Sequence, residues 1–108
     1  MTRVEYQMKV EDVAPSGEPV SPWWPQRIEP FIPTGVKWEP DPDHLAYISF
    51  RSRGDAIAVR ENIRRTHPQT NVRIWAQPIP IEDEADFLDE NAGNCVLDPD
   101  GIFVKPER

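Results

Sequence analysis

Proline is concentrated in one stretch of this chain, and this distribution constrains the fold more than any other feature. Eight of the 13 prolines lie between Pro15 and Pro42. Proline lacks an N–H donor and biases the preceding residue toward extended geometry, so the stretch excludes a long helix or a central strand. Large apolar residues are interleaved with the prolines; they are Trp23, Trp24, Ile28, Phe31, Ile32, Val36 and Trp38. We therefore expect residues 14–43 to form an extended segment that packs across the chain's own core.

Three other segments have the pattern of β-strands. Residues 3–11 alternate between apolar and polar side chains, which is typical of a strand with one buried face. Residues 44–50 (HLAYISF) are rich in aromatic and β-branched side chains, which favour strands. Residues 71–76 (NVRIWA) show the same preference.

A helix is predicted between the second and third of these strands. Ser52 and Asp55 resemble a capping box at its start, and Pro68 limits its end to about Thr66. Ala56, Val59 and Ile63 fall on one helical face. Residues 44–77 therefore predict a strand–helix–strand core, read as a right-handed βαβ crossover.

The C-terminal part predicts an acidic segment and a hairpin. Residues 82–91 (EDEADFLDEN) are expected to form a short acidic helix with Ala85 and Leu88 facing inward. Asp98-Pro99-Asp100-Gly101 is a turn sequence at the centre of residues 94–105, which predict the hairpin.

Together these elements predict an α+β fold with a small mixed or antiparallel sheet of four to five strands. The sheet contains the βαβ unit, and one main helix packs on one face. In outline this resembles ferredoxin-like and RNA-recognition sheets. The aromatic strand of the RNA-recognition family is not matched, because residues 44–50 contain Tyr47 and Phe50 but lack that family's glycine and basic pattern.

Length and composition predict one soluble cytoplasmic domain over residues 1–108. A chain of 108 residues is of single-domain size. Cys95 is the only cysteine, so no intramolecular disulfide forms and a reducing compartment is favoured. Neither a membrane span nor a signal peptide is recognisable. The many arginines and few lysines fit an accessory protein of a GC-rich bacterium or its phage.

Charge is divided sharply along the chain, although the net charge is −7. Residues 51–81 carry six arginines against Asp55 and Glu61, whereas the segments on either side are acidic. The net charge disfavours nonspecific nucleic-acid binding, which needs a basic surface.

Arg53, Arg60 and Arg64 are spaced to share one helical face, which we call the arginine face and which could bind an anion or an acidic partner. The alternative is a solvated face that pairs with the chain's own acidic tail.

The acidic segment 82–91 also has a functional and a purely structural interpretation. Its carboxylates, among them Asp83, Glu84 and Asp86, either form a surface for a basic partner or for mimicry of DNA, or only favour solubility.

Trp23 and Trp24 are the strongest candidates for a contact site, with Trp38 in the same segment. Adjacent side chains of an extended segment point in opposite directions, so both are hard to bury in one core. Tryptophan is also enriched at binding hot spots. The alternative is that one ring completes the core and the other lies on the surface.

Catalytic and metal signals are weak. His44, His67 and Cys95 show no zinc spacing, and Cys95 pairs with a histidine only if folding brings them together. Asp98 and Asp100 match part of a calcium loop, but a plain hairpin turn explains them better. We expect no catalytic residues, no metal and no cofactor.

The leading hypothesis is therefore a non-enzymatic module that binds and modulates a protein partner, expected to be basic. Trp23, Trp24 and the Pro-rich segment 14–43 would supply the apolar anchor. The carboxylates of the acidic segment 82–91 would attract the basic partner over a distance. Two alternatives remain: a structural subunit of a homo-oligomer, and an anion or nucleic-acid binder that uses the arginine face.

Overall fold

The computed structural model describes residues 3–42, 44–82, 86–91 and 93–106. Along the chain the elements are β1 (Arg3–Val13), β2 (Pro19–Pro22), α1 (Pro25–Ile28), the 3-10 helix η1 (Glu29–Phe31), β3 (Trp38–Pro40), β4 (Tyr47–Phe50), α2 (Arg53–Thr66), β5 (Thr70–Ile79), β6 (Val96–Leu97) and β7 (Phe103–Val104). They form an α+β fold with a mixed sheet and two α-helices. Among the described residues, no helix is long and apolar enough to cross a membrane.

Within the described residues the sheet has seven strands, so the prediction of four to five was wrong. Its order is β3-β4-β1-β5-β7-β6, and β2 pairs with the end of β1. The proline segment contributes β2 and β3, where the sequence predicted only extended chain. Both strands lie at the margins of the sheet, where a missing proline N–H removes few ladder hydrogen bonds.

The strand–helix–strand core has a third strand inserted into it. β4 and β5 are both antiparallel to β1, which lies between them. They therefore run parallel to each other without pairing directly. β5 and β7 form a parallel pair, and β6 and β7 form the hairpin that the turn sequence predicts.

Helix α2 begins and ends where the sequence predicted. The Ser52 hydroxyl caps it by accepting a hydrogen bond from the Asp55 N–H at 3.4 Å. Ala56, Val59 and Ile63 are buried along one face. This apolar stripe packs the helix against the sheet.

The main core lies between the sheet and the helices. Met8 of β1 is opposite Ile48 of β4 and Ile74 of β5, and all three are buried. The proline segment covers this core as expected, with Trp23 and Ile28 inside it. Each large apolar side chain buried in this way contributes about 1.5–3 kcal/mol.

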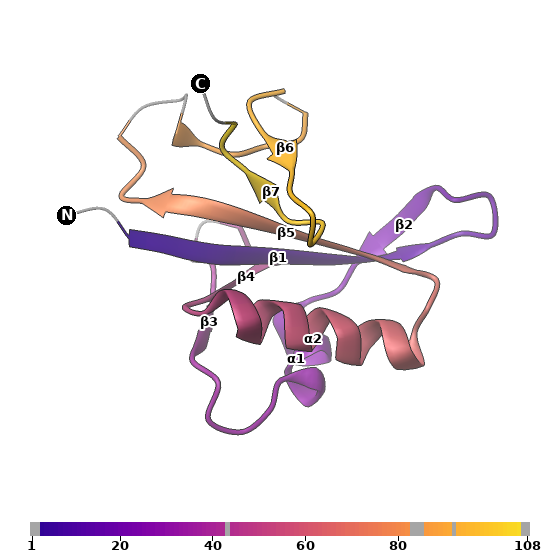
Figure 1. Ribbon diagram of the computed structural model, residues 1–108. Helices are drawn as coiled ribbons and strands as arrows, with labels where there is room; N and C mark the ends of the chain where they lie inside the picture. Colours follow the sequence, from indigo (N-terminus) through magenta and orange to yellow (C-terminus); the bar gives the residue numbers. More distant parts are fainter. Residues whose placement is uncertain (1–2, 43, 83–85, 92, 107–108) are drawn as a thin grey trace.

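The opposite face of the sheet is covered only in part. The chain after β5 folds back over this face, on the side away from α2 (Figure 1). Gln77 holds this segment: its side-chain amide donates to the Leu88 carbonyl at 2.7 Å, and its oxygen accepts from the Leu88 N–H at 3.0 Å.

Of the acidic helix predicted over residues 82–91, Asp86 is in 3-10 helical conformation, whereas residues 87–91 are not helical. Here the backbone groups of Leu88 bond to the Gln77 side chain, and the Asp89 N–H donates to the Asn94 side chain. Leu88 is buried, as predicted. Asp83, Glu84 and Ala85 lie outside the described residues.

Candidate partner-binding surface

The two adjacent tryptophans have opposite environments. Trp23 is 1% exposed, whereas Trp24 is 51% exposed. Trp23 packs against Phe31 and His67, with ring centroids at 5.8 and 5.1 Å. Trp23 is thus a core residue with almost no surface for a partner, and Trp24 is the exposed member of the pair.

A polar contact fixes the buried indole in place. Trp23 Nε1 donates to Asp12 Oδ1 at 2.7 Å, and Arg27 lies 4.0 Å above the ring while bonding the other Asp12 oxygen. The hydrogen bond from Trp23, reinforced by Arg27, lowers the pKa of Asp12 despite some opposing desolvation. The start of the proline segment is therefore tied to the end of β1.

Trp24 borders a shallow apolar hollow of about 520 Å³. The other residues that line it are Pro25, Gln26, Pro40 and Leu45. Leu45 is 66% exposed. Two large apolar side chains thus meet at one surface site, although they come from different segments of the chain.

A second concave site, a groove, shares Pro40 with this hollow. This groove of about 290 Å³ lies on the partly covered face of the sheet, and its lining residues are Glu5, Gln7, Glu39, Pro40, Asp41, Pro42, His44, Ser49, Ile79, Ile81 and Phe87. It adjoins a smaller hollow of about 100 Å³, which shares Gln7, His44 and Phe87 and adds Tyr47, Trp75, Gln77, Leu88 and Asp89. We call the two together the sheet-face groove.

The sheet-face groove is acidic. Glu5, Glu39, Asp41 and Asp89 contribute carboxylates, and no lysine or arginine is present among its described lining residues. Glu5 is neutralised by Arg3 and Arg51, at 3.1 and 3.5 Å. Glu39 and Asp89 form no ion pair within the described part of the chain. The groove therefore suits a positively charged group.

The other predicted contact residues lie elsewhere. Trp38 is half-buried and packs against the core from β3. Asp86 accepts from Lys105 Nζ at 2.6 Å. Asp83 and Glu84, from the acidic segment, belong to the part that the structure does not describe.

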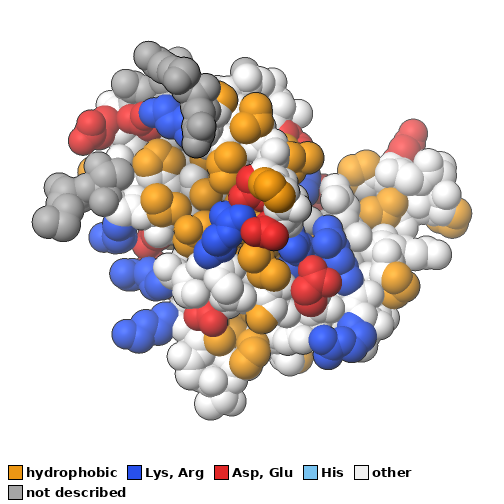
Figure 2. Space-filling view, viewed as in Figure 1, with side chains coloured by type: hydrophobic (Ala, Val, Ile, Leu, Met, Phe, Trp, Pro, Cys, Tyr) orange, Lys and Arg blue, Asp and Glu red, His pale blue; other side chains and the backbone are white. Residues whose placement is uncertain are grey.

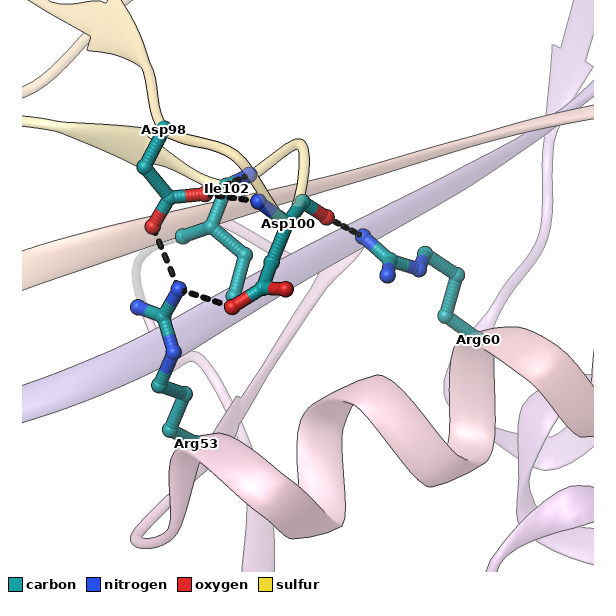
Figure 3. A network of polar contacts seen from close by, with 5 residues as sticks. All are labelled: Arg53, Arg60, Asp98, Asp100 and Ile102. Carbon is teal, nitrogen blue, oxygen red and sulfur yellow. Dashed lines mark hydrogen bonds and ion pairs between the residues drawn. The ribbon is translucent and has the colours of Figure 1, made fainter.

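The arginine face binds the C-terminal hairpin of the same chain (Figure 3). Arg53 Nη2 lies 2.5 Å from Asp98 Oδ2 and 2.8 Å from Asp100 Oδ2. Arg60 is buried and donates to the Asp100 carbonyl at 2.8 Å. In the centre of the face seen in Figure 2, basic side chains accordingly lie directly beside acidic ones.

This pairing leaves little of the arginine face for an anion. Arg64 is exposed, with Glu61 at 3.8 Å. The hydrogen bonds that Arg53 donates to Asp100 and Asp98 also raise the pKa of Arg53. The contacts match the reading in which the helix pairs with the acidic tail.

Asp98 organises the hairpin turn. Its Oδ1 accepts from the N–H groups of Asp100 and Ile102, at 2.9 and 3.0 Å. Burial raises the pKa of Asp98, but Arg53 and these two N–H groups outweigh burial, so the pKa falls below its ordinary value. These bonds explain the Asp-rich sequence as a hairpin turn.

The histidines and the cysteine have separate surroundings. His44 packs on Tyr47, and His67 packs on Trp23 and Phe31. Cys95 is half-buried, and burial raises the pKa of its thiol. Within the described ranges, no three His, Cys, Asp or Glu residues are grouped closely enough to hold a metal ion.

Sequence reasoning missed the sheet-face groove. The sequence predicts His44 and Tyr47 only as part of one strand, and Trp75 only as part of another. The alternation of residues 3–11 places Glu5 and Gln7 on the polar face, and that was the one available signal.

Comparison of the chain with protein-family models, curated proteins and solved structures finds no match.

Proposed function

We propose that this protein is a non-enzymatic module that binds a protein partner at the Trp24–Leu45 hollow. The observation that carries the proposal is the pair of exposed side chains, Trp24 at 51% and Leu45 at 66%, around one apolar hollow. Exposed tryptophan supplies large rigid area at binding hot spots. Trp23 already fills the core position nearby, so the Trp24 ring is not needed to complete that core.

The hollow favours docking of side chains over strand addition. It lies at β3, an edge strand of the sheet. Pro40 in this strand has no N–H to donate, so an added strand would find an incomplete ladder. A partner would therefore insert an apolar side chain between Trp24 and Leu45.

The charge beside the hollow favours a basic partner. Pro40 lines both this hollow and the acidic sheet-face groove. The net charge of −7 adds long-range attraction for a positive surface. Association should therefore slow as salt increases, while the apolar anchor should govern dissociation.

The test compares partner capture by the wild type, Trp24→Ala and Val20→Ala. Val20 is 66% exposed, like Leu45, but lies on β2 outside the hollow, so it provides a matched control. A protein captured by the wild type and Val20→Ala, and lost by Trp24→Ala, is then purified for kinetic measurement. Equal affinity of that partner for the wild type and Trp24→Ala would overturn the proposal.

A homo-oligomeric subunit is the second candidate. Val96 and Leu97 form the edge strand β6 and are both exposed. An exposed apolar edge strand can pair with a second copy of the chain. A monomeric mass by light scattering at high protein concentration would eliminate this candidate.

A further inference from the structure

A row of aromatic rings crosses the face of the sheet that lies opposite α2. Tyr47 of β4 lies 5.6 Å from Trp75 of β5, and Trp75 stacks on Phe103 of β7 at 5.5 Å. His44 extends the row, 5.5 Å from Tyr47. The rings come from distant parts of the sequence and meet because their strands place them on the same face.

The row already binds cations of this chain on one side. Lys9 Nζ lies 5.4 Å from the Tyr47 ring centroid, and the Arg73 guanidinium lies 5.5 Å from that of Trp75. Arg73 also pairs with the carboxylates of Glu11 and Glu90. This arrangement joins a guanidinium to an aromatic ring and to two carboxylates.

In the sheet-face groove, two of these rings lie beside further carboxylates. Tyr47 and Phe87 supply the accessible aromatic surface, Trp75 lines the smaller hollow with only 3% of its surface exposed, and Asp89 belongs to the same lining. Glu39 lies in the wider part of the groove, near the β3 edge. Among the described lining residues there is no lysine or arginine to neutralise these carboxylates.

We propose that the sheet-face groove binds the side chain of an arginine from a basic protein partner. This inference rests on the proposed function, because it names what the partner places beside its apolar anchor. A guanidinium stacks on aromatic rings and donates to carboxylates in its own plane, which suits this set of groups better than an ammonium does. The groove holds the extended side chain, and the smaller hollow holds its planar end.

The experiment uses N-acetyl-arginine methylamide as the probe, titrated into the whole chain and followed by ¹⁵N–¹H NMR. Trp75 Nε1 is a buried donor without a partner in the described part of the chain, so its resonance should respond to a group entering the hollow. The citrulline analogue is the control, since it has nearly the same shape without the charge. We expect the arginine probe to cause saturable shifts at the Trp75 indole. The citrulline analogue should bind at least about tenfold more weakly.

Two charge-neutralising variants locate the site. Glu39→Gln and Asp89→Asn should each weaken binding of the arginine probe several-fold, while Glu18→Gln, in the exposed β1–β2 connection, should not. Trp24→Ala should leave probe binding unchanged, so failure of the proposed function and failure of this inference are distinguishable. Equal binding of arginine and citrulline probes, or no saturable shift at Trp75, overturns the assignment. So does unchanged binding in both groove variants.

Discussion

Arg60 Nη1 donates to the backbone carbonyl of Asp100 at 2.8 Å, although forty residues separate the two in sequence. Arg53, seven residues earlier on α2, bonds the side chains of Asp98 and Asp100 in the same turn. Helix α2 therefore holds the β6–β7 turn at two points. Because β7 pairs with β5, these contacts help to set the edge of the sheet (Figure 3).

Replacing Arg60 with methionine should destabilise the protein. Arg60→Met keeps much of the apolar stem but leaves a carbonyl without its charged donor, and such a bond contributes about 1.5–3 kcal/mol. Urea unfolding should show a loss of that order in the free energy of unfolding. Arg64→Met on the exposed part of the helix is the control and should change it by about 0.5 kcal/mol or less. Equal effects of the two substitutions would mean that the Asp100 contact is not stabilising.

Stability should fall in acid partly through Asp98. Its pKa is lowered in the folded state, so the unfolded state binds the proton more readily. This contribution is present above the ordinary aspartate pKa of about 3.9, and it is lost as the pH falls through the folded-state value. Asp98→Asn should therefore be less stable than the wild type at neutral pH, with the gap narrowing below about pH 4. Urea unfolding of the wild type and Asp98→Asn, from neutral pH to below about pH 4, measures this difference in the free energy of unfolding. A difference that widens in acid would contradict the stabilising role of the ionised Asp98.

The elements with strong local signals were predictable from the sequence. Alternation identified β1, and a serine cap with a following proline bounded α2. The turn residues around Pro99 located the hairpin. β2 and β3 were missed because proline argues against strands, and only tertiary pairing at the sheet margins overrides that preference.

The candidate sites were likewise predictable only where a local sequence signal exists. An exposed Trp24 beside a buried Trp23 follows from the opposite directions of adjacent side chains in extended chain. The sequence could not show which of the two is buried, since the contacts of Trp23 with Asp12, Arg27 and Phe31 arise only in the folded chain. The sheet-face groove was beyond prediction because Tyr47 and Trp75 meet only through the strand order β4-β1-β5.

The two adjacent tryptophans should differ sharply in their effect on stability. Trp23→Ala removes a fully buried ring and the donor to Asp12, and should cost about 3–5 kcal/mol. Trp24→Ala removes a ring that is half in solvent and should cost about 1 kcal/mol or less. Thermal and urea unfolding of the two variants test this contrast. Similar losses for both would show that Trp24 is part of the folded core, which would weaken its proposed role as an anchor.

Gln77 should control the segment that covers one side of the sheet-face groove. Its side chain satisfies both backbone groups of Leu88, so Gln77→Leu leaves a buried N–H and a buried carbonyl unpaired. Each unsatisfied group costs about 1–3 kcal/mol, which favours local release of residues 86–91. Hydrogen exchange at the Leu88 amide should accelerate strongly, while exchange within α2 changes less. Gln69→Leu, at an exposed position between α2 and β5, is the matched control and should leave the Leu88 amide protected. If Leu88 exchanges at the wild-type rate in Gln77→Leu, contacts other than the amide pair hold the segment against the sheet.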